Sequence, residues 1–242
     1  MSDRRLHWPA CRNARDLGGL RTTDGGQIRA GALIRTDDLS RLTADGVAAL
    51  RSYGVRRIID LRSGDEMIRT PGPFADDPIY FRAPLIDEQA ERHRDPVKEV
   101  TLAATYRGSI ERNGRTIAAG ILALACAPQG GVVVHCAAGK DRTGIHVALA
   151  LRVADVRLDE IAADYALTRE YLREYVEIEP GRAIEELVTR SPQELRSSRP
   201  ETILGMLEYV ETSYGSVAHY LRRNDISPDQ IAALRARLRA TE

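Results

Sequence analysis

The chain has 242 residues, enough for one large α/β domain, and its 43% hydrophobic and 29% charged residues are ordinary for a globular protein. Its 35 basic and 35 acidic residues cancel, which gives no support to a nucleic-acid partner. We expect no integral membrane segment, since no run of about 18 apolar residues occurs, and no secretory signal, since the N-terminus has no apolar core.

The first half of the chain alternates between strand and helix patterns. Strands are predicted at 31–36, 55–61 and 79–86, and helices at 42–54, 97–112 and 115–127. Thr43 is the expected N-cap of the first helix, Gly54 lies beyond its end, and the polar residues 87–96 are predicted as a loop. GVVVHC (131–136) is typical of a central parallel strand covered on both faces, and 142–156 follows as a helix.

The second part of the chain has helical patterns only. They cover 158–176, 183–190, 201–214 and 227–240, with a break at 191–200. The alternation before residue 156 predicts an α/β fold with a mostly parallel central sheet flanked by helices. We expect residues 1–242 to form a single domain, in which residues 156–242 are an all-helical cover.

Three cysteines, Cys11, Cys126 and Cys136, are too few for a disulfide framework and are typical of a reducing compartment. The expected location is therefore the cytoplasm, and export without a signal peptide stays open. Cys126 lies in the apolar segment ILALACAP and is predicted to belong to the core, whereas Cys11 has no assigned role. His146, in the helix at 142–156, is predicted to be a packed histidine.

Cys136 lies where the apolar strand ends, and a helix begins near Arg142. The five residues between them form a loop at the carboxyl edge of a parallel sheet, where open α/β folds bind ligands. The small residues 137–139 allow backbone N–H groups to approach an anion, and Arg142 can bind two phosphate oxygens. The same donors favour a thiolate at Cys136. The loop is predicted to bind a phosphoryl group and to supply its nucleophile.

HCAAGKDRTG (135–144) matches the His-Cys-x5-Arg-Thr signature of the cysteine-dependent protein tyrosine phosphatase superfamily. It most resembles the bacterial tyrosine and lipid phosphatases whose loop carries Gly-Lys-Asp-Arg-Thr-Gly. Further segments that resemble this family are NARDLGGL, IRTDDLSRLT, IIDLRSGDE, ADYALTREYL and YGSVAHYLRR. The resemblance covers most of the chain and implies a tyrosine-phosphatase-like fold and hydrolysis through a phosphocysteine. It also implies that neither a metal nor another cofactor takes part and that inorganic phosphate is a product.

The resemblance implies roles for the loop residues. Cys136 is the expected nucleophile, Arg142 is expected to stabilise the transition-state charge, and His135 is expected to orient the loop. The Thr143 hydroxyl is expected to help the intermediate break down, although a local backbone hydrogen bond is the alternative. The expected phosphate-binding residues are Ala137, Ala138, Gly139, Lys140, Asp141 and Arg142. The expected supporting residues are Asp16, Asp60 and Arg62, with Arg15 beside them, and Asp37 and Asp38 are possible turn formers.

A proton donor for the leaving group has two candidates. The Trp-Pro-Asp motif of many tyrosine phosphatases is absent, because the only Trp-Pro, Trp8-Pro9, precedes Ala10. Asp141, inside the loop, is favoured because the resembling bacterial enzymes place an acid there; its alternative role is to pair with Arg15 or another arginine. Asp87, after the strand at 79–86, holds the topological position of the usual acid loop.

Lys140 bears on the substrate. Phosphoinositide phosphatases of this superfamily carry a lysine at this loop position, and the alternative is a solvated lysine on the loop rim. Their loops often have another basic residue directly after the cysteine, where this chain has Ala137, which counts against a strictly lipid-directed function. The tyrosines at 165, 171 and 175 are expected to line the core or a groove. Part of 158–200 is hypothesised to be a lid, as in some family members.

The predicted function is hydrolysis of phosphate monoesters, mainly of phosphotyrosine in proteins, with phosphoserine, phosphothreonine or phosphoinositides as further substrates. Three alternatives stay open. One is a phosphatase of phosphoinositides or inositol phosphates rather than of proteins. Another is a rhodanese-like sulfurtransferase, which also presents a cysteine on an anion-binding loop, and against which Arg142 and Thr143 weigh. The third is a phosphate-binding adaptor without catalytic activity, against which the intact Cys136 and Arg142 weigh.

Overall fold

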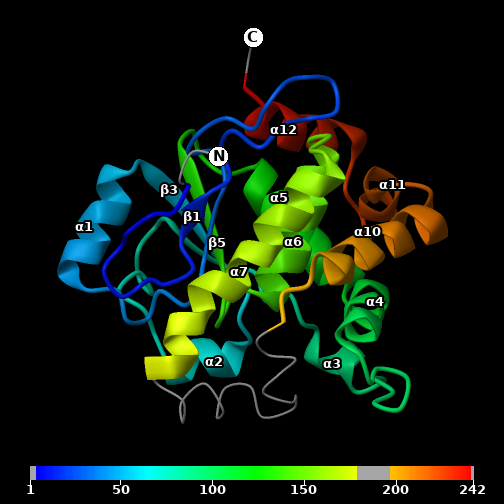
Figure 1. The fold of residues 1–242 in the computed structure, drawn as a ribbon, viewed down its shortest axis with the longest axis horizontal. Helices are drawn as coiled ribbons and strands as arrows, with labels where there is room; N and C mark the ends of the chain where they lie inside the picture. Colours follow the sequence, from blue (N-terminus) through cyan, green and yellow to red (C-terminus); the bar gives the residue numbers. More distant parts are fainter. Residues whose placement is uncertain (1–3, 179–196, 241–242) are drawn as a thin grey trace.

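A five-stranded sheet forms the centre of the computed structural model, which describes residues 4–178 and 197–240 (Figure 1). The strands, in their order across the sheet, are β1 (Arg15–Asp16), β2 (Ile34–Thr36), β5 (Gly131–His135), β3 (Val55–Asp60) and β4 (Tyr80–Arg82). The four strands from β2 to β4 are parallel, and only β1 is antiparallel to its neighbour. The predicted α/β class with a mostly parallel sheet is confirmed.

The register of the sheet brings strand ends together. His135 at the end of β5 is paired with Thr36 at the end of β2 on one side and with Asp60 at the end of β3 on the other. The chain leaves β5 between these two ends, so Cys136 and the residues after it begin at the carboxyl edge of the sheet. This edge is where open parallel sheets bind their ligands.

Helices flank the sheet (Figure 1). They are α1 (Ala44–Ser52), α2 (Gly64–Arg69), α3 (Glu88–Glu91), α4 (Leu102–Arg112), α5 (Gly114–Ala125), α6 (Asp141–Val153), α7 (Leu158–Ile178), α10 (Pro200–Tyr214), α11 (Val217–Arg223) and α12 (Pro228–Leu238). Thr43 caps α1 as predicted, and Gly54 adopts the left-handed φ of +86° that follows this helix.

Several short elements differ from the prediction. The expected loop at 87–96 contains α3, and α2 was not predicted because six residues carry too little helical periodicity. The strand expected at 79–86 is paired only over β4, and the helix expected from residue 97 begins at Leu102 with Thr101 as its cap. Polar caps, rather than the apolar pattern, determine where these elements begin.

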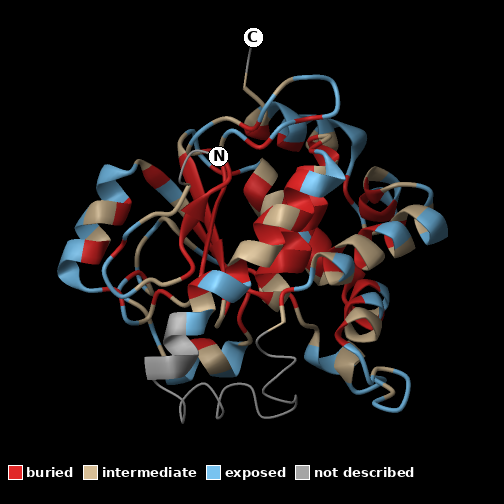
Figure 2. Ribbon diagram, viewed as in Figure 1, coloured by how far each residue is buried: buried red, intermediate tan, exposed pale blue. Residues whose placement is uncertain are grey.

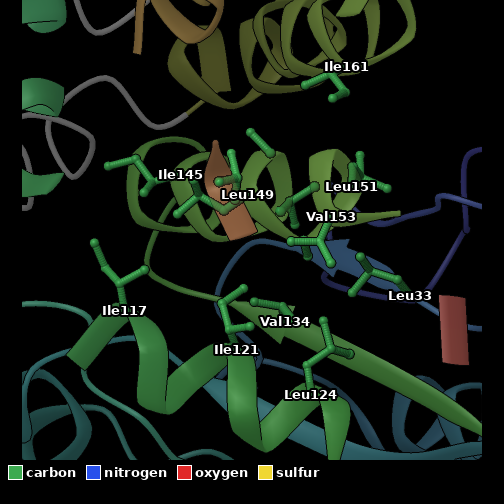
Figure 3. Close-up of a cluster of buried hydrophobic side chains, with 14 of the residues drawn as sticks. Leu33, Ile117, Ile121, Leu124, Val134, Ile145, Leu149, Leu151, Val153 and Ile161 are labelled. Carbon is green, nitrogen blue, oxygen red and sulfur yellow. The ribbon is translucent and has the colours of Figure 1, made fainter. Parts of the chain in front are cut away.

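The sheet separates two hydrophobic clusters. Val133 of β5 packs with Ile34, Ile58 and Leu50 on the side of α1. Val132 and Val134 belong to the larger cluster on the other side. Figure 3 shows part of this cluster, with Ile121 and Leu124 of α5, Leu149 and Leu151 of α6 and Val134 together. Full burial of each such side chain contributes about 1.5–3 kcal/mol, which fixes α6 and hence the loop before it.

The C-terminal helices share the larger cluster. Ile203 of α10, Leu221 of α11 and Leu234 of α12 are fully buried in it (Figure 2). The helix predicted at 183–190 and most of the predicted break at 191–200 lie outside the described residues, and the lid stays a hypothesis. Between residues 4 and 178 and from 197 to 240, no helix combines the length and apolarity needed to cross a membrane.

Two predictions about single residues have clear outcomes. His146 is buried against α5, as predicted, and burial lowers its pKa to about 4. The prediction for Cys126 is wrong, because this residue is exposed. It caps the C-terminus of α5, one residue beyond the helix whose buried face carries Ile117, Ile121 and Leu124. The apolar segment continues past the helix, but the buried face does not.

Candidate active site

The loop between β5 and α6 makes a close approach to the end of β2. Gly139 has a φ of +65°, and a Cβ there would lie 2.3 Å from the Thr36 carbonyl oxygen. Any other residue would be strained and would push the loop away from the sheet. Cys136 and Lys140, on either side of this tight segment, are each buried. The glycine therefore fixes the path of the loop.

Neighbouring segments hold the loop carbonyls from outside. Asn13 Nδ2 donates to the carbonyls of Ala138 (3.0 Å) and Gly139 (3.2 Å). Arg35 Nη2 donates to the Gly139 carbonyl (2.7 Å), and the backbone N–H of Asp38 donates to the Ala137 carbonyl (2.9 Å). In a trans peptide the N–H points away from the C=O. Bonding the carbonyls outward therefore turns the N–H groups of this segment toward the inside of the loop, where they can bind an anion.

Asp164 of α7 joins the two arginines behind the loop. Its carboxylate accepts hydrogen bonds from Arg15 Nε and Arg35 Nη1, both at 2.9 Å, and all three side chains are buried. Burial alone would raise the pKa of Asp164, but the charges of Arg15 and Arg35 hold it far below its usual range. Arg15 also donates to Asn13, which holds the loop. Thus Arg15 supports the loop from behind, together with Arg35 and Asn13.

A carboxylate on α2 holds Arg142. Glu66 Oε2 lies 2.5 Å from Arg142 Nη1, and Glu66 Oε1 lies 2.7 Å from Nη2, so the pair is bidentate. Burial raises the pKa of Glu66, but Arg142 outweighs it and lowers that pKa to about 2. Glu66 also completes a capping box with Ser63 at the start of α2.

Sequence reasoning missed Glu66 as a site residue. The signal was present, because Ser63 and Glu66 form the S-x-x-E pattern within the family-like segment IIDLRSGDE. That pattern explains the glutamate as a helix cap, and nothing in it points to Arg142.

Asp60 and Arg62 connect to the loop through short chains of contacts. Asp60 accepts hydrogen bonds from Arg62 Nε, and His135 Nε2 lies 3.6 Å from its carboxylate. Arg62 also pairs with Asp38 (2.9 Å), whose backbone holds Ala137. Burial raises the pKa of Asp60, but the charges of His135 and Arg62 dominate and lower it to about 2.

Asp16 does not support the loop in this way. Its carboxylate accepts hydrogen bonds from the backbone of Gly18 (2.9 Å) and Gly31 (2.7 Å) and from the Tyr53 hydroxyl (2.8 Å). Asp16 is paired with Ile34, so it lies toward the amino end of β2, away from the end occupied by the loop. The physical reason for the difference is the alternation of side chains along a strand, which points Arg15 and Asp16 to opposite faces of the sheet, so Arg15 meets Asp164 while Asp16 meets Tyr53.

The two residues before Arg142 differ in exposure, since Lys140 is buried and Asp141 is partly exposed. Lys140 is 2% exposed, unlike a solvated rim lysine, and its Nζ lies 3.7 Å from Asp141 Oδ1. Asp141 is the first residue of α6, and its Oδ1 accepts a hydrogen bond of 2.7 Å from the Tyr106 hydroxyl. Arg15, the alternative partner considered for Asp141, is paired with Asp164 instead.

Asp87 and Thr143 are the remaining predicted residues. The Asp87 carboxylate caps α3, where it accepts hydrogen bonds from the backbone of Gln89 (2.9 Å) and Ala90 (3.3 Å). The Thr143 hydroxyl is buried and, among the described residues, has no hydrogen-bond partner. It therefore does not make the local backbone bond that was the alternative, and it is left available for a group bound in the loop.

Comparison with known proteins gives three findings. Residues 6–240 match the family described as the tyrosine phosphatase family. The chain is 30% identical over 226 residues to a tyrosine-protein phosphatase of Nostoc commune, covering 87% of this chain and 75% of that protein. It is also 30% identical over 272 aligned positions to the triple specificity protein phosphatase PtpB of Mycobacterium tuberculosis, covering 94% of this chain and 96% of that protein.

Proposed function

The chain belongs to the tyrosine phosphatase family and is a protein tyrosine phosphatase, and from that premise we propose that Cys136 is its nucleophile, Arg142 its phosphate ligand and Asp141 its general acid. The sulfurtransferase alternative is not favoured, since the matched family and both relatives are phosphatases. One observation carries the proposal. The buried Cys136 begins a loop whose carbonyls are bonded outward by Asn13, Arg35 and Asp38, as an anion-binding loop requires.

In the first step, the Cys136 thiolate attacks the phosphorus of the substrate. The S–P bond forms while the bond from phosphorus to the leaving oxygen breaks, and the Asp141 carboxyl gives its proton to that oxygen. The guanidinium of Arg142, held by Glu66, binds two phosphoryl oxygens and stabilises their charge in the transition state. The products of this step are a phosphocysteine and the free phenol or alcohol.

In the second step, water attacks the phosphocysteine. The Asp141 carboxylate accepts a proton from the water, the S–P bond breaks, and inorganic phosphate leaves. The sulfur departs as a thiolate, which the buried hydroxyl of Thr143 stabilises by donating a hydrogen bond. The enzyme returns to its starting state, so the cycle balances without another reactant.

We propose Asp141 rather than Asp87 as the acid because of what each carboxylate does in the structure. Asp141 lies in the loop, five residues from Cys136, and its side chain is 28% exposed, so a leaving group and an attacking water can reach it. The Asp87 carboxylate is occupied by the N-terminus of α3. Replacing Asp87 by alanine is therefore expected to loosen α3 with little effect on turnover.

Proposed substrates are phosphotyrosine proteins first, and phosphoserine, phosphothreonine and phosphoinositides in addition. The wider range is supported by the buried Lys140 of the loop, which adds positive charge for a second phosphate, and by the relative that is named a triple specificity phosphatase. Phosphoinositides or inositol phosphates as the main substrates are the second candidate, which rests on Lys140 alone.

The test is a turnover panel with a phosphotyrosine peptide, a phosphoserine peptide, a phosphoinositide and an inositol phosphate. We expect the phosphotyrosine peptide to give the highest kcat/KM, Cys136→Ser to abolish turnover of all four, and Asp141→Asn to lower it by about 10²-fold or more. A higher kcat/KM for the phosphoinositide would reverse the proposed order. Retained activity of Asp141→Asn with loss in Asp87→Asn would move the acid to Asp87.

We further propose that the chain forms one phosphatase domain in the cytoplasm. The shared hydrophobic cluster of the sheet and of α10, α11 and α12 supports the first point. The free cysteines Cys11, Cys126 and Cys136 support a reducing compartment. Fractionation of cells and medium tests the location, and accumulation of the protein in the medium would contradict it.

A further inference from the structure

A chain of three hydroxyl and carboxyl groups leads from α7 through α4 to the start of α6. The Tyr106 hydroxyl donates to Asp141 Oδ1 at 2.7 Å, and the hydroxyls of Tyr106 and Tyr165 lie 2.7 Å apart. Both tyrosines are 1% exposed. Two buried phenol groups cost free energy unless they are bonded, so a chain of bonds from Tyr165 through Tyr106 to one carboxylate sets a defined position for that carboxylate.

The direction of the hydrogen bonds follows from counting protons. Tyr106 has one hydroxyl proton, and it is used in the bond to Asp141. Tyr165 must therefore be the donor in the bond between the two tyrosines. Burial, with Asp141 and Tyr165 nearby, raises the pKa of Tyr106 well above its usual value. Tyr106 thus stays protonated and remains a donor throughout the working pH range.

The rings are fixed as firmly as the hydroxyls. Tyr106 and Tyr165 meet edge to face, with ring centroids 6.4 Å apart. Tyr165 also packs directly on the first turn of α6, where a Cβ at Gly144 would lie 2.9 Å from its ring. Both tyrosines belong to the large hydrophobic cluster. Their hydroxyls therefore hold a constant position relative to the first residue of α6.

We propose that Tyr106 is a positioning residue for Asp141, and that Tyr165 orients Tyr106. A hydrogen bond to Oδ1 fixes the rotation of the carboxyl group, so that its other oxygen meets the leaving group in each catalytic cycle. An acid inside the phosphate loop needs such an anchor because a misplacement of about 1 Å can cost 10²-fold in rate. This inference rests on the proposed role of Asp141 as the acid.

The test compares two aryl phosphates whose leaving groups differ in basicity and hence in their need for a proton. Phenyl phosphate releases a basic phenolate and needs the acid, whereas 2,4-dinitrophenyl phosphate releases a weakly basic dinitrophenolate that leaves readily without a proton. We expect Tyr106→Phe to lower kcat/KM about 10-fold on phenyl phosphate and less than about 3-fold on the dinitrophenyl ester. Tyr165→Phe should show the same selectivity with a smaller loss, and it also serves as the test if Tyr106→Phe does not fold.

The control variant is Tyr220→Phe. Tyr220 is also 1% exposed, and its hydroxyl donates to the Ile110 carbonyl of α4 at 3.0 Å, so it loses a comparable buried bond. We expect it to leave the ratio of the two rates unchanged. In an Asp141→Asn background, Tyr106→Phe should cause no further selective loss, because the group through which it acts is gone.

Equal losses on both substrates, or a full selective loss in the Asp141→Asn background, would overturn the positioning role. The two proposals fail in different ways. If Asp141→Asn is selective for phenyl phosphate and Tyr106→Phe is not, only the positioning role is wrong. If Asp141→Asn itself shows no selectivity, the acid is another residue and both proposals are wrong.

Discussion

Replacing Glu66 by glutamine tests how far Arg142 depends on α2. Glutamine also serves at the third position of a capping box, so α2 keeps its N-terminal cap. The substitution removes the charge from a bidentate pair with distances of 2.5 and 2.7 Å. Hydrogen bonds between charged groups contribute about 1.5–3 kcal/mol, a range that is reduced here because Arg142 and Glu66 are 20% and 25% exposed.

Glutamine retains one acceptor oxygen, so we expect the poorer orientation of Arg142 to raise the activation free energy by about 1.5 kcal/mol. This corresponds to a kcat/KM that is lower by about tenfold. The assay is hydrolysis of 4-nitrophenyl phosphate at saturating and limiting substrate. The matched control is Glu211→Gln, since Glu211 pairs with Arg152 at 2.6 Å at the other end of α6 and is similarly exposed. That control should stay within about twofold of the parent. An unchanged kcat/KM for Glu66→Gln, or equal losses in both variants, would refute the reasoning.

Three further perturbations test the support of the loop. Gly139→Ala should lower kcat/KM on 4-nitrophenyl phosphate at least about 10²-fold, because its Cβ would lie 2.3 Å from the Thr36 carbonyl oxygen; half of the parent activity would contradict this. Asp164→Asn should lower the free energy of unfolding, measured in urea, by about 3 kcal/mol. The reason is that the substitution leaves the buried guanidiniums of Arg15 and Arg35 without this counter-charge. A loss below about 1 kcal/mol would count against this role of Asp164. The pKa values of Asp60 and Glu66 are lowered to about 2, so Asp60 contributes about 2 kcal/mol and Glu66 about 3 kcal/mol of stability, present above about pH 4.5 and lost as the pH falls through about 2. Urea unfolding between pH 6 and 2 measures this slope, which Asp60→Asn should reduce.

The parts of the site that are local in sequence could be predicted. An apolar strand, a loop of small residues and a helix follow one another directly, so the pattern of 131–156 contains the whole loop, from Cys136 to Arg142. The position of this loop at the edge of the sheet follows from parallel topology alone. Thr43 and Gly54 bounded α1 for the same reason, because capping chemistry acts within a few residues.

The parts that depend on distant contacts could not be predicted. Glu66 is 76 residues from Arg142, and Tyr106 is 35 residues from Asp141, and no spacing rule connects such positions. Asp16 bonds elsewhere because neighbouring residues of a strand point to opposite faces, and the pattern of a two-residue strand does not show which face holds the loop. Cys126 shows a further reason, since an apolar segment can continue past the end of the helix that buries it.

The most direct test of the central claim, that Cys136 carries the phosphoryl group, is rapid alkaline quench of the enzyme during turnover of an aryl phosphate, followed by peptide mapping at alkaline pH. We predict phosphate bound to the sulfur of Cys136, formed at the rate of phenol release and absent from Cys136→Ser. Phosphate on another residue, or turnover by Cys136→Ser with no phosphoenzyme, would contradict the claim.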